Sequence, residues 1–432
     1  RAIPGVGAVV SLLGDDRMVR FVGDPIAAVA AKDRKTALAA IAAIRVSSER
    51  LPSVIGLDAA RKPDSPAVFE RSSRKRAGNV SEGTPAPAAW HGNVRGPSSA
   101  FSQKARKAKN WIAAAREQRN PWLFEATFRT GTQSHSCLEP HATVARFDGD
   151  RLTVHVSTQS VFHVMELLAK RYKLGHDKVR VIADHVGGGF GSKGTLGIET
   201  IAAVELAREA RAPVRIAYDR HEELSVTGYR PATEMKIALL PSEQGELKAL
   251  SLTAYADTGA ATNSTLAALA RLIYPAEAKE LADYDVISNL PPGAPFRGPG
   301  GPPMAFALEQ AIDEAALRMK LDPIALRKRW DPDPNRQRLY EWAAGLEVWR
   351  NAGTAAAQTG RYRRGVGVAT GYWLYLWQPG VKIELKVEGG RLIASTATQD
   401  IGQGSRTVIA NTVAHEFGLE PHDVEVRIGD SS

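Results

Sequence analysis

Residues 185–193 read His-Val-Gly-Gly-Gly-Phe-Gly-Ser-Lys, which places four glycines and one aromatic ring within nine positions. The stretch follows a strand-like run at 179–182 and precedes a helical pattern at 198–210. Glycine accepts positive φ and lets backbone N–H groups approach a ligand, and a helix start just beyond would favour an anion. A tight turn without a ligand does not need this glycine density, so the pattern favours a binding loop. The spacing is not that of a P-loop.

A second loop, residues 291–303, reads PPGAPFRGPGGPP and carries one cation, Arg297. Proline makes such a loop rigid, and glycine leaves its backbone approachable. This composition would present a guanidinium to an oxyanion or to cofactor oxygens. An ordinary proline-rich surface loop is the alternative interpretation.

Two glutamines lie at similar strand-to-helix connections. Gln403 stands between Gly402 and Gly404, and its amide offers donors and an acceptor that suit a heteroatom-rich organic ring better than a bare metal. Gln159 follows a strand-like run and would sit at the mouth of a sheet. A solvent-facing glutamine is the alternative at both positions.

The periodicity around these loops predicts an α+β or mixed α/β protein of several packed units. Residues 1–60 are expected to form a small unit with strands at 18–22 and 26–30 and a helix from Asp33. We expect a surface linker from 61 to about 99, and then a helix over 101–120. Further strands are predicted at 123–128, 151–157, 179–182, 214–218, 235–240, 381–387, 391–396 and 424–428, and helices at 161–174, 198–210, 304–320, 335–346 and 407–417.

Composition restricts the classes of function. Lys and Arg number 56 against 47 Asp and Glu, but the densest basic runs stand beside no nucleic-acid-reading motif, so no nucleic-acid partner is expected. The single cysteine, Cys137, allows no intrachain disulfide and no four-thiolate cluster. The histidines form no HExxH spacing, which predicts no metal held by protein side chains. No apolar run predicts a membrane span, and we expect a cytoplasmic location, with the periplasm as the alternative.

Taken in chain order, these segments resemble the molybdopterin-binding subunit of the xanthine dehydrogenase and aldehyde oxidase family. The matching segments are VRFVGDPIAAV at 19–29, QSH at 133–135, LEP at 138–140, STQ at 157–159, GGGFGSK at 187–193, DR at 219–220, FRG at 296–298 and DIGQG at 400–404. The resemblance implies an α/β hammerhead domain at 1–60, a linker and connecting helix at 61–120, a first molybdopterin-binding domain at 121–330, and the start of a second at 331–432.

The resemblance also implies roles for particular residues. It places Gln159, Phe190 and Arg297 around the molybdenum as catalytic residues, and Arg271 lies near where some relatives place a substrate-orienting arginine. The cofactor-binding residues that it implies are Gly188, Gly189, Phe190, Gly191, Arg297, Gly402, Gln403 and Gly404. The pterin, rather than any side chain, holds the metal. The expected cofactor is molybdenum–molybdopterin, with the cytosine dinucleotide as one form, and a 2Fe-2S cluster and FAD are expected on partner subunits.

The implied activity is oxidative hydroxylation of an aldehyde or an N-heteroaromatic, with water as the oxygen source and electrons passed to the iron–sulfur and flavin partners. A purine dehydrogenase subunit and a non-catalytic cofactor scaffold or carrier are the alternatives. Gly194 stands where xanthine enzymes carry a glutamate, and Pro299 replaces an aromatic, which disfavours a purine pocket. The Arg297 loop also lacks the cysteine of carbon monoxide dehydrogenases. The family's late Gly-Glu segment with the general base is not found here, so we expect that part of the fold to lie on further sequence or another polypeptide.

Overall fold

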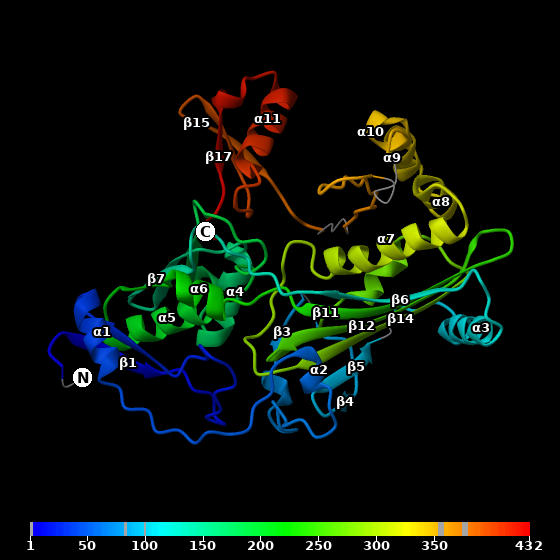
Figure 1. Ribbon diagram of the computed structural model, residues 1–432. Coiled ribbons are helices and arrows are strands. Elements are labelled where there is room, and N and C mark those ends of the chain that lie inside the picture. Colours follow the sequence, from blue (N-terminus) through cyan, green and yellow to red (C-terminus); the bar gives the residue numbers. More distant parts are fainter. Residues whose placement is uncertain (1–2, 82–83, 99–100, 353–357, 374–378) are drawn as a thin grey trace.

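The computed structural model describes residues 3–81, 84–98, 101–352, 358–373 and 379–432. The architecture is mixed α/β, as the sequence predicts, with helices packed against several separate sheets (Figure 1). Residues 1–2, 82–83, 99–100, 353–357 and 374–378 fall within the predicted units but lie outside the described residues.

A six-stranded sheet forms the largest core. Helix α7 (Gly301–Arg318) covers one face and α3 (Ala105–Glu117) covers one end of the other (Figure 1). Strand β11 shows why, because Met235 and Ile237 point into the α7 core whereas Ala238 points towards α3. In spatial order the strands are β4 (Trp90–His91), β5 (Val94–Ser98), β14 (Ala278–Ile287), β12 (Leu247–Gly259), β11 (Ala232–Pro241) and β6 (Phe124–Thr130).

A four-stranded sheet forms the second core together with helices on its surface. Its strands, in spatial order, are β10 (Val214–Ala217), β7 (Ala142–Asp148), β8 (Arg151–Val156) and β9 (Val179–Ile182). The helices are α4 (Val161–Tyr172), α5 (Ile198–Ala210) and α6 (Arg220–Val226). The antiparallel pair β1 (Val6–Ser11) and β2 (Ala27–Ala31), followed by α1 (Arg34–Ala42), contributes Ala8 to this same buried cluster.

The C-terminal part carries a three-stranded sheet with one helix, standing above the four-stranded unit in Figure 1. Its elements are β15 (Glu384–Glu388), β16 (Arg391–Ser395), α11 (Ser405–Phe417) and β17 (Val424–Arg427). Between α7 and this sheet run α8 (Pro323–Trp330), α9 (Pro334–Gly345) and α10 (Glu347–Arg350). The remaining short elements are α2 (Leu57–Ala60), β3 (Gly78–Asn79), β13 (Ala261–Thr262) and the 3-10 turns at Arg74–Arg76, His176–Lys178, Ala267–Leu272 and Pro421–Asp423.

Two expectations about the N-terminal quarter are wrong. Residues 18–22 form no strand, because the Arg20 backbone N–H and guanidinium bond to Asp24 and Asp16 within a loop, and β1 pairs with β2 instead. The stretch 61–99 is also more than a surface linker, since β5 pairs with β14 and joins the six-stranded sheet. This strand was not predicted because it contains glycine and proline, which are rare in strand interiors.

Most other predicted elements are confirmed within a few residues of their ends, including β9, α5 and α11. Strands β7, β12 and β14 and helix α8 were not predicted. Asp283 and Asp285 interrupt the apolar pattern of β14, although both carboxylates are buried.

Candidate functional site

Four connections that each leave a strand and enter a helix meet at one cleft of about 1170 Å³. They join β8 to α4, β9 to α5, β14 to α7 and β16 to α11. Ligands bind preferentially where such connections gather at strand ends. From these four connections the cleft is lined by Gln159, Gly189, Phe190, Gly191, Pro295, Arg297, Gly298, Pro299, Ile401, Gly402 and Gln403.

The cleft therefore brings together most of the sequence-predicted residues. Phe190, Arg297 and Gln403, which are far apart in sequence, all line it. Gly188 and Gly404 belong to the same two loops but are not among the lining residues. The remaining wall comes from the 263–272 segment, which includes Arg271, and from Ser81, Thr84, Ala86, Arg95, Ser98, Phe101, Asp283 and Trp373.

The glycine loop is packed against other parts of the chain more tightly than expected. A Cβ on Gly187 would overlap Glu139, one on Gly189 would overlap Gln159, and one on Gly191 would overlap the carbonyl of Pro295. Three of its four glycines are therefore required by neighbouring protein atoms. The start of α5 is not free for a ligand anion either, because the Glu199 carboxylate folds back over the backbone before the helix.

Lys193 anchors the end of the glycine loop to Glu139, and this role was not predicted from the sequence. Its ammonium group is fully buried and donates to the carbonyl of Glu139 at 2.8 Å and to its carboxylate at 3.1 Å. The same carboxylate accepts from Ser157 Oγ and Gly187 N. Burial opposes ionisation of Glu139, but these hydrogen bonds and the Lys193 charge lower its pKa. An ion pair between buried Lys193 and partly exposed Glu139 therefore supports the loop.

The backbone of the glycine loop is joined directly to the Arg297 loop. Phe190 adopts φ +54, a left-handed conformation that is strained for a bulky side chain, and its carbonyl accepts from Arg297 N at 2.8 Å. The Phe190 ring is 41% exposed. Among the described residues, the N–H groups of Gly188, Gly189 and Phe190 have no hydrogen-bond partner. These donors remain available to a ligand.

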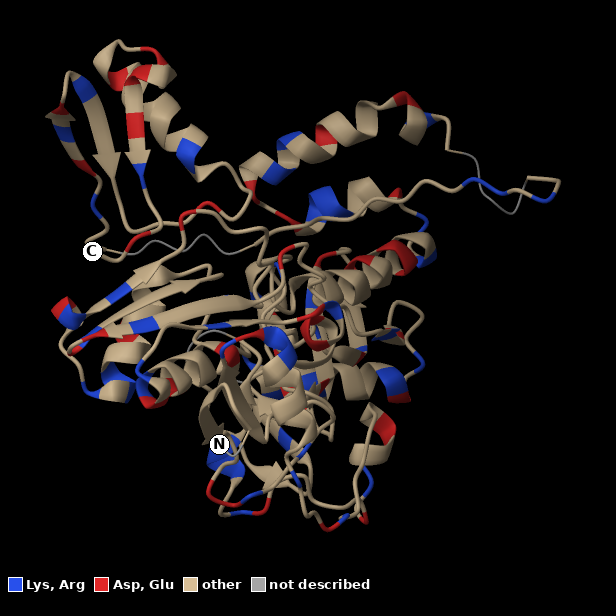
Figure 2. Cartoon of the chain, turned by 90° about the vertical axis from the view of Figure 1, so that its left-hand side faces the viewer, with Lys and Arg blue, Asp and Glu red and all other residues tan. Residues whose placement is uncertain are grey.

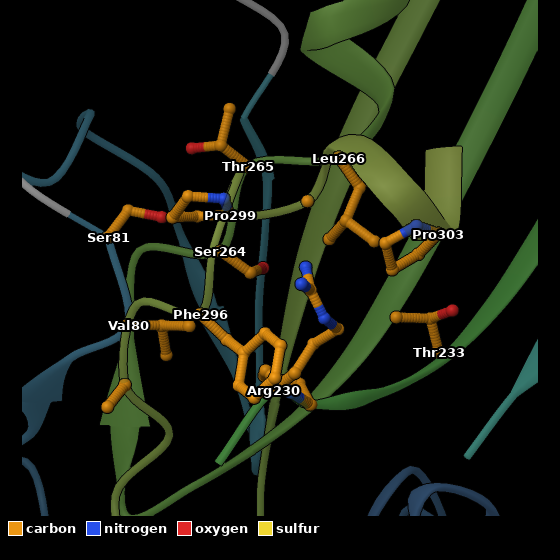
Figure 3. A pocket seen from close by; sticks show the side chains of 13 residues that line it. Val80, Ser81, Arg230, Thr233, Ser264, Thr265, Leu266, Phe296, Pro299 and Pro303 are labelled. Carbon is orange, nitrogen blue, oxygen red and sulfur yellow. The ribbon is translucent and has the colours of Figure 1, made fainter. Parts of the chain in front are cut away.

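Arg230 supports the Arg297 loop from behind. Its guanidinium donates to the carbonyls of Arg297 and Gly298 and lies 4.6 Å from the Phe296 ring centre. His135 also packs against that ring, with ring centres 4.8 Å apart, and bonds to the Pro295 carbonyl. Figure 3 shows the Arg230 and Phe296 side chains next to each other in a neighbouring small cavity of about 20 Å³, room for about one water.

The side chain of Gln159 is held by its oxygen. Oε1 accepts from Gly191 N at 2.7 Å and from Lys193 N at 3.3 Å. Its amide nitrogen has no partner in the described part of the chain, so two N–H donors are left at the cleft.

The Gln403 loop is organised by Asp400. Its carboxylate accepts from the N–H groups of Gly402, Gly404 and Arg406. Gln403 turns its amide into its own loop, with Oε1 accepting from Ile401 N and Nε2 donating to the Gln399 carbonyl and to Ser405 Oγ. A Cβ on Gly402 or Gly404 would meet nothing within 4 Å. This wall is open.

The charges of the cleft favour an anionic ligand. The guanidinium groups of Arg297 and Arg271 have no ion-pair partner among the described residues, although Arg271 lies over the Phe101 ring. Burial raises the pKa of Asp283 to about 7, despite three N–H groups donated by residues 266–268. Basic and acidic residues are interspersed along many of the same elements (Figure 2).

Within the described ranges, no group of three or more His, Cys, Asp or Glu could hold a metal ion. No described helix is both long and apolar enough to cross a bilayer.

Comparison with known proteins identifies the family. A model for the molybdopterin cofactor-binding domain matches residues 101–330, more than half of the chain, and a second model with the same description matches residues 341–432. The aldehyde oxidoreductase molybdenum-binding subunit PaoC of Escherichia coli K12 is 31% identical over 325 residues, which cover 72% of this chain and 44% of that protein. The probable hypoxanthine oxidase XdhD of E. coli O157:H7 is 28% identical, covering 96% of this chain and 48% of that protein.

Solved structures share the fold. The CO dehydrogenase from Oligotropha carboxidovorans superposes with a TM-score of 0.77 over 100% of this chain and 60% of that chain, at 22% identity. The chain spans about half the length of the curated relatives that it matches. It belongs to the family of molybdopterin-binding large subunits of xanthine dehydrogenases and aldehyde oxidoreductases.

Proposed function

We propose that the chain holds the molybdenum–molybdopterin cofactor of an oxidative hydroxylase that acts on aldehydes or N-heteroaromatics, with water as the oxygen source. The observation that carries this proposal is the meeting of Phe190, Arg297 and Gln403 at one cleft. One ligand that spans the cleft would contact all three of these loops, which are more than 100 positions apart in sequence.

The residues of the cleft fit the cofactor. Unpaired N–H groups on Gly189 and Phe190, the guanidinium of Arg297 and the free Gln159 amide nitrogen match a ligand rich in oxygen and nitrogen acceptors. The open faces of Gly402 and Gly404 leave room for a ring beside that wall. The Nε2 donors of Gln403 are already used within its loop, so its oxygen, which has a second lone pair, would accept from the pterin. When bound, the cofactor supplies the two-electron redox chemistry.

The residues of this chain would then contribute donors that are held in place and would exclude water from the substrate. Donors that are fixed before substrate arrives stabilise developing negative charge without reorganisation. Gln159 is fixed through its oxygen, and Arg297 is fixed through its own backbone N–H to Phe190. The Phe190 ring and the apolar wall of Leu269 and Leu272 would exclude water from the substrate.

Electron transfer would require partners. Cys137 is the single cysteine, so we propose that the 2Fe-2S cluster lies outside these 432 residues, with FAD on a further subunit. PaoC is named as a subunit of an aldehyde oxidoreductase, which supports the aldehyde class.

Two other functions remain as alternatives. XdhD is named as a probable hypoxanthine oxidase, and a purine dehydrogenase would oxidise hypoxanthine. Gly194, which carries no side chain to contact a purine, speaks against this reading. A scaffold or carrier would hold the cofactor without turnover. Assays of the purified complex with an aromatic aldehyde, an N-heteroaromatic and hypoxanthine separate all three.

The direct test uses Arg297→Ala in the purified complex, with Arg106→Ala as the control because Arg106 is an exposed arginine on α3, away from the cleft. Metal analysis and pterin fluorescence are measured with turnover. We expect Arg297→Ala to lower kcat by roughly 100-fold, the cost of one fixed charge donor, or to lose molybdenum, while the circular dichroism spectrum is unchanged. Full activity and full occupancy in this variant would remove the proposed role.

A further inference from the structure

The C-terminal end of the described chain is joined to the glycine-loop side of the cleft. Gly429 accepts from Ala183 N at 2.7 Å, and Ser431 N donates to the Val181 carbonyl at 3.0 Å. Figure 1 shows the C-terminus lying against the four-stranded unit. These contacts form a seam between β9 and the residues after β17.

Arg406 crosses this seam with a partly buried guanidinium. Nη2 donates to the Asp184 carbonyl at 2.7 Å, and Nη1 donates to the Val426 carbonyl at 3.1 Å. A weaker bond from Nη2 reaches the Ile428 carbonyl at 3.4 Å. The guanidinium forms no ion pair in the part of the chain that the structure describes, so backbone carbonyls are its partners. Hydrogen bonds from a charged donor are stronger than neutral ones.

The local sequence does not account for an arginine at this position. Arg406 lies in the first turn of α11, where the helix dipole disfavours a positive charge. From this position the side chain can bond to backbone carbonyls on both sides of the seam. Asp184 immediately precedes the glycine motif, and Arg406 immediately follows the Gln403 loop. One guanidinium therefore connects the chain at both walls of the cleft.

We propose that Arg406 is a positioning residue, which sets the spacing between the glycine loop and the Gln403 loop and so preforms the cleft. This deepens the proposed function, because the ligand that needs the spacing is the cofactor. The connection itself is independent of the ligand.

The test compares two arginines of the same seam. Arg406→Gln removes the partly buried guanidinium, whereas Arg180→Gln removes an arginine whose side chain is 53% exposed and pairs with Asp430. The rate at which pterin leaves the purified complex is measured after dilution, alongside the thermal unfolding midpoint. We expect release to be roughly tenfold faster for Arg406→Gln, the equivalent of one or two lost charge-assisted hydrogen bonds, and within about twofold of wild type for Arg180→Gln.

Rescue separates positioning from general destabilisation. Millimolar guanidinium should slow pterin release in Arg406→Ala and leave Arg180→Ala unchanged, and Arg406→Lys should lie between wild type and Arg406→Gln because an ammonium lacks the forked donors. Equal release rates for the Arg406 and Arg180 variants would overturn the proposal.

A wild-type complex without pterin would refute the proposed function instead. In that case amide hydrogen exchange at Ala183 tests the connection alone. Faster exchange in Arg406→Gln than in Arg180→Gln supports it, and unchanged exchange overturns it.

Discussion

The glycine loop and the Gln403 loop contain similar motifs but are packed in opposite ways. At Gly187, Gly189 and Gly191 an added Cβ would overlap Glu139, Gln159 or the backbone of the Arg297 loop. At Gly402 and Gly404 it would meet nothing within 4 Å. Glycine in the first loop allows protein to approach protein, whereas glycine in the second leaves room at the cleft.

This difference indicates that the two loops have different roles in the cleft. The first loop is fixed before any ligand arrives, because Lys193, Glu139 and Gln159 hold it through partly buried hydrogen bonds. The second loop is held by its own residues Asp400 and Gln403, by Arg406 at its edge and by the packing of Ile401 on the buried cluster of the four-stranded unit. Ligand binding should therefore change the second loop more than the first.

The largest effect is expected from alanine at the packed glycine. Gly191→Ala adds a methyl group against the Pro295 carbonyl at φ +112, so we expect a loss of about 3 kcal/mol in the free energy of unfolding and loss of molybdenum. Gly402→Ala is the matched control, because its φ of +108 gives similar backbone strain but its surroundings are open. It should cost about 1 kcal/mol. Equal costs in urea unfolding would refute the packing difference.

An intermediate effect is expected from pH. The His141 ring joins Glu223 at 2.9 Å to the Ser192 carbonyl in the glycine loop at 3.2 Å, and both partners accept, which favours the doubly protonated ring. Burial lowers the pKa of His141, but the hydrogen bond to Glu223 and the charges of Glu199 and Glu223 outweigh it, so the pKa is raised above 6.5. Burial opposes ionisation of Glu223, but its hydrogen bonds with His141, the His141 charge and the Lys193 charge lower its pKa.

A raised histidine pKa stabilises the fold fully below 6.5, and the contribution is lost as pH rises through the folded value. The difference in unfolding midpoint between wild type and His141→Gln should therefore shrink above pH 6.5. Hydrogen exchange should loosen in the glycine loop over that range and stay constant in the Gln403 loop, because Asp400, whose pKa is lowered, remains ionised. A pH-independent difference between the two proteins would contradict this assignment.

The smallest effect on stability is expected at Gln403. Its side chain is exposed and bonds only within its loop, so Gln403→Ala should change the free energy of unfolding by less than about 1 kcal/mol. Pterin retention should fall nevertheless, because the loop loses its internal support. Unchanged cofactor occupancy, measured by pterin fluorescence, would remove Gln403 from the site.

The sequence predicted the loops of the cleft better than the supports beneath them. Phe190, Arg297 and Gln403 stand in glycine-rich or proline-rich segments, whose composition is visible locally. Arg230 and Lys193 act through carbonyl groups 67 and 54 positions away, and no local pattern records such distant partners. The strand at 94–98 escaped prediction for the same reason, because pairing with β14 outweighs its poor propensity.

The central claim is that three loops grip one ligand, and hydrogen exchange measured with and without the cofactor tests it most directly. Amides of residues 188–190, 296–298 and 402–404 should become protected together when the cofactor is loaded, with the greatest gain at 402–404. Protection confined to one loop, or spread equally over distant elements such as α3, would contradict the account.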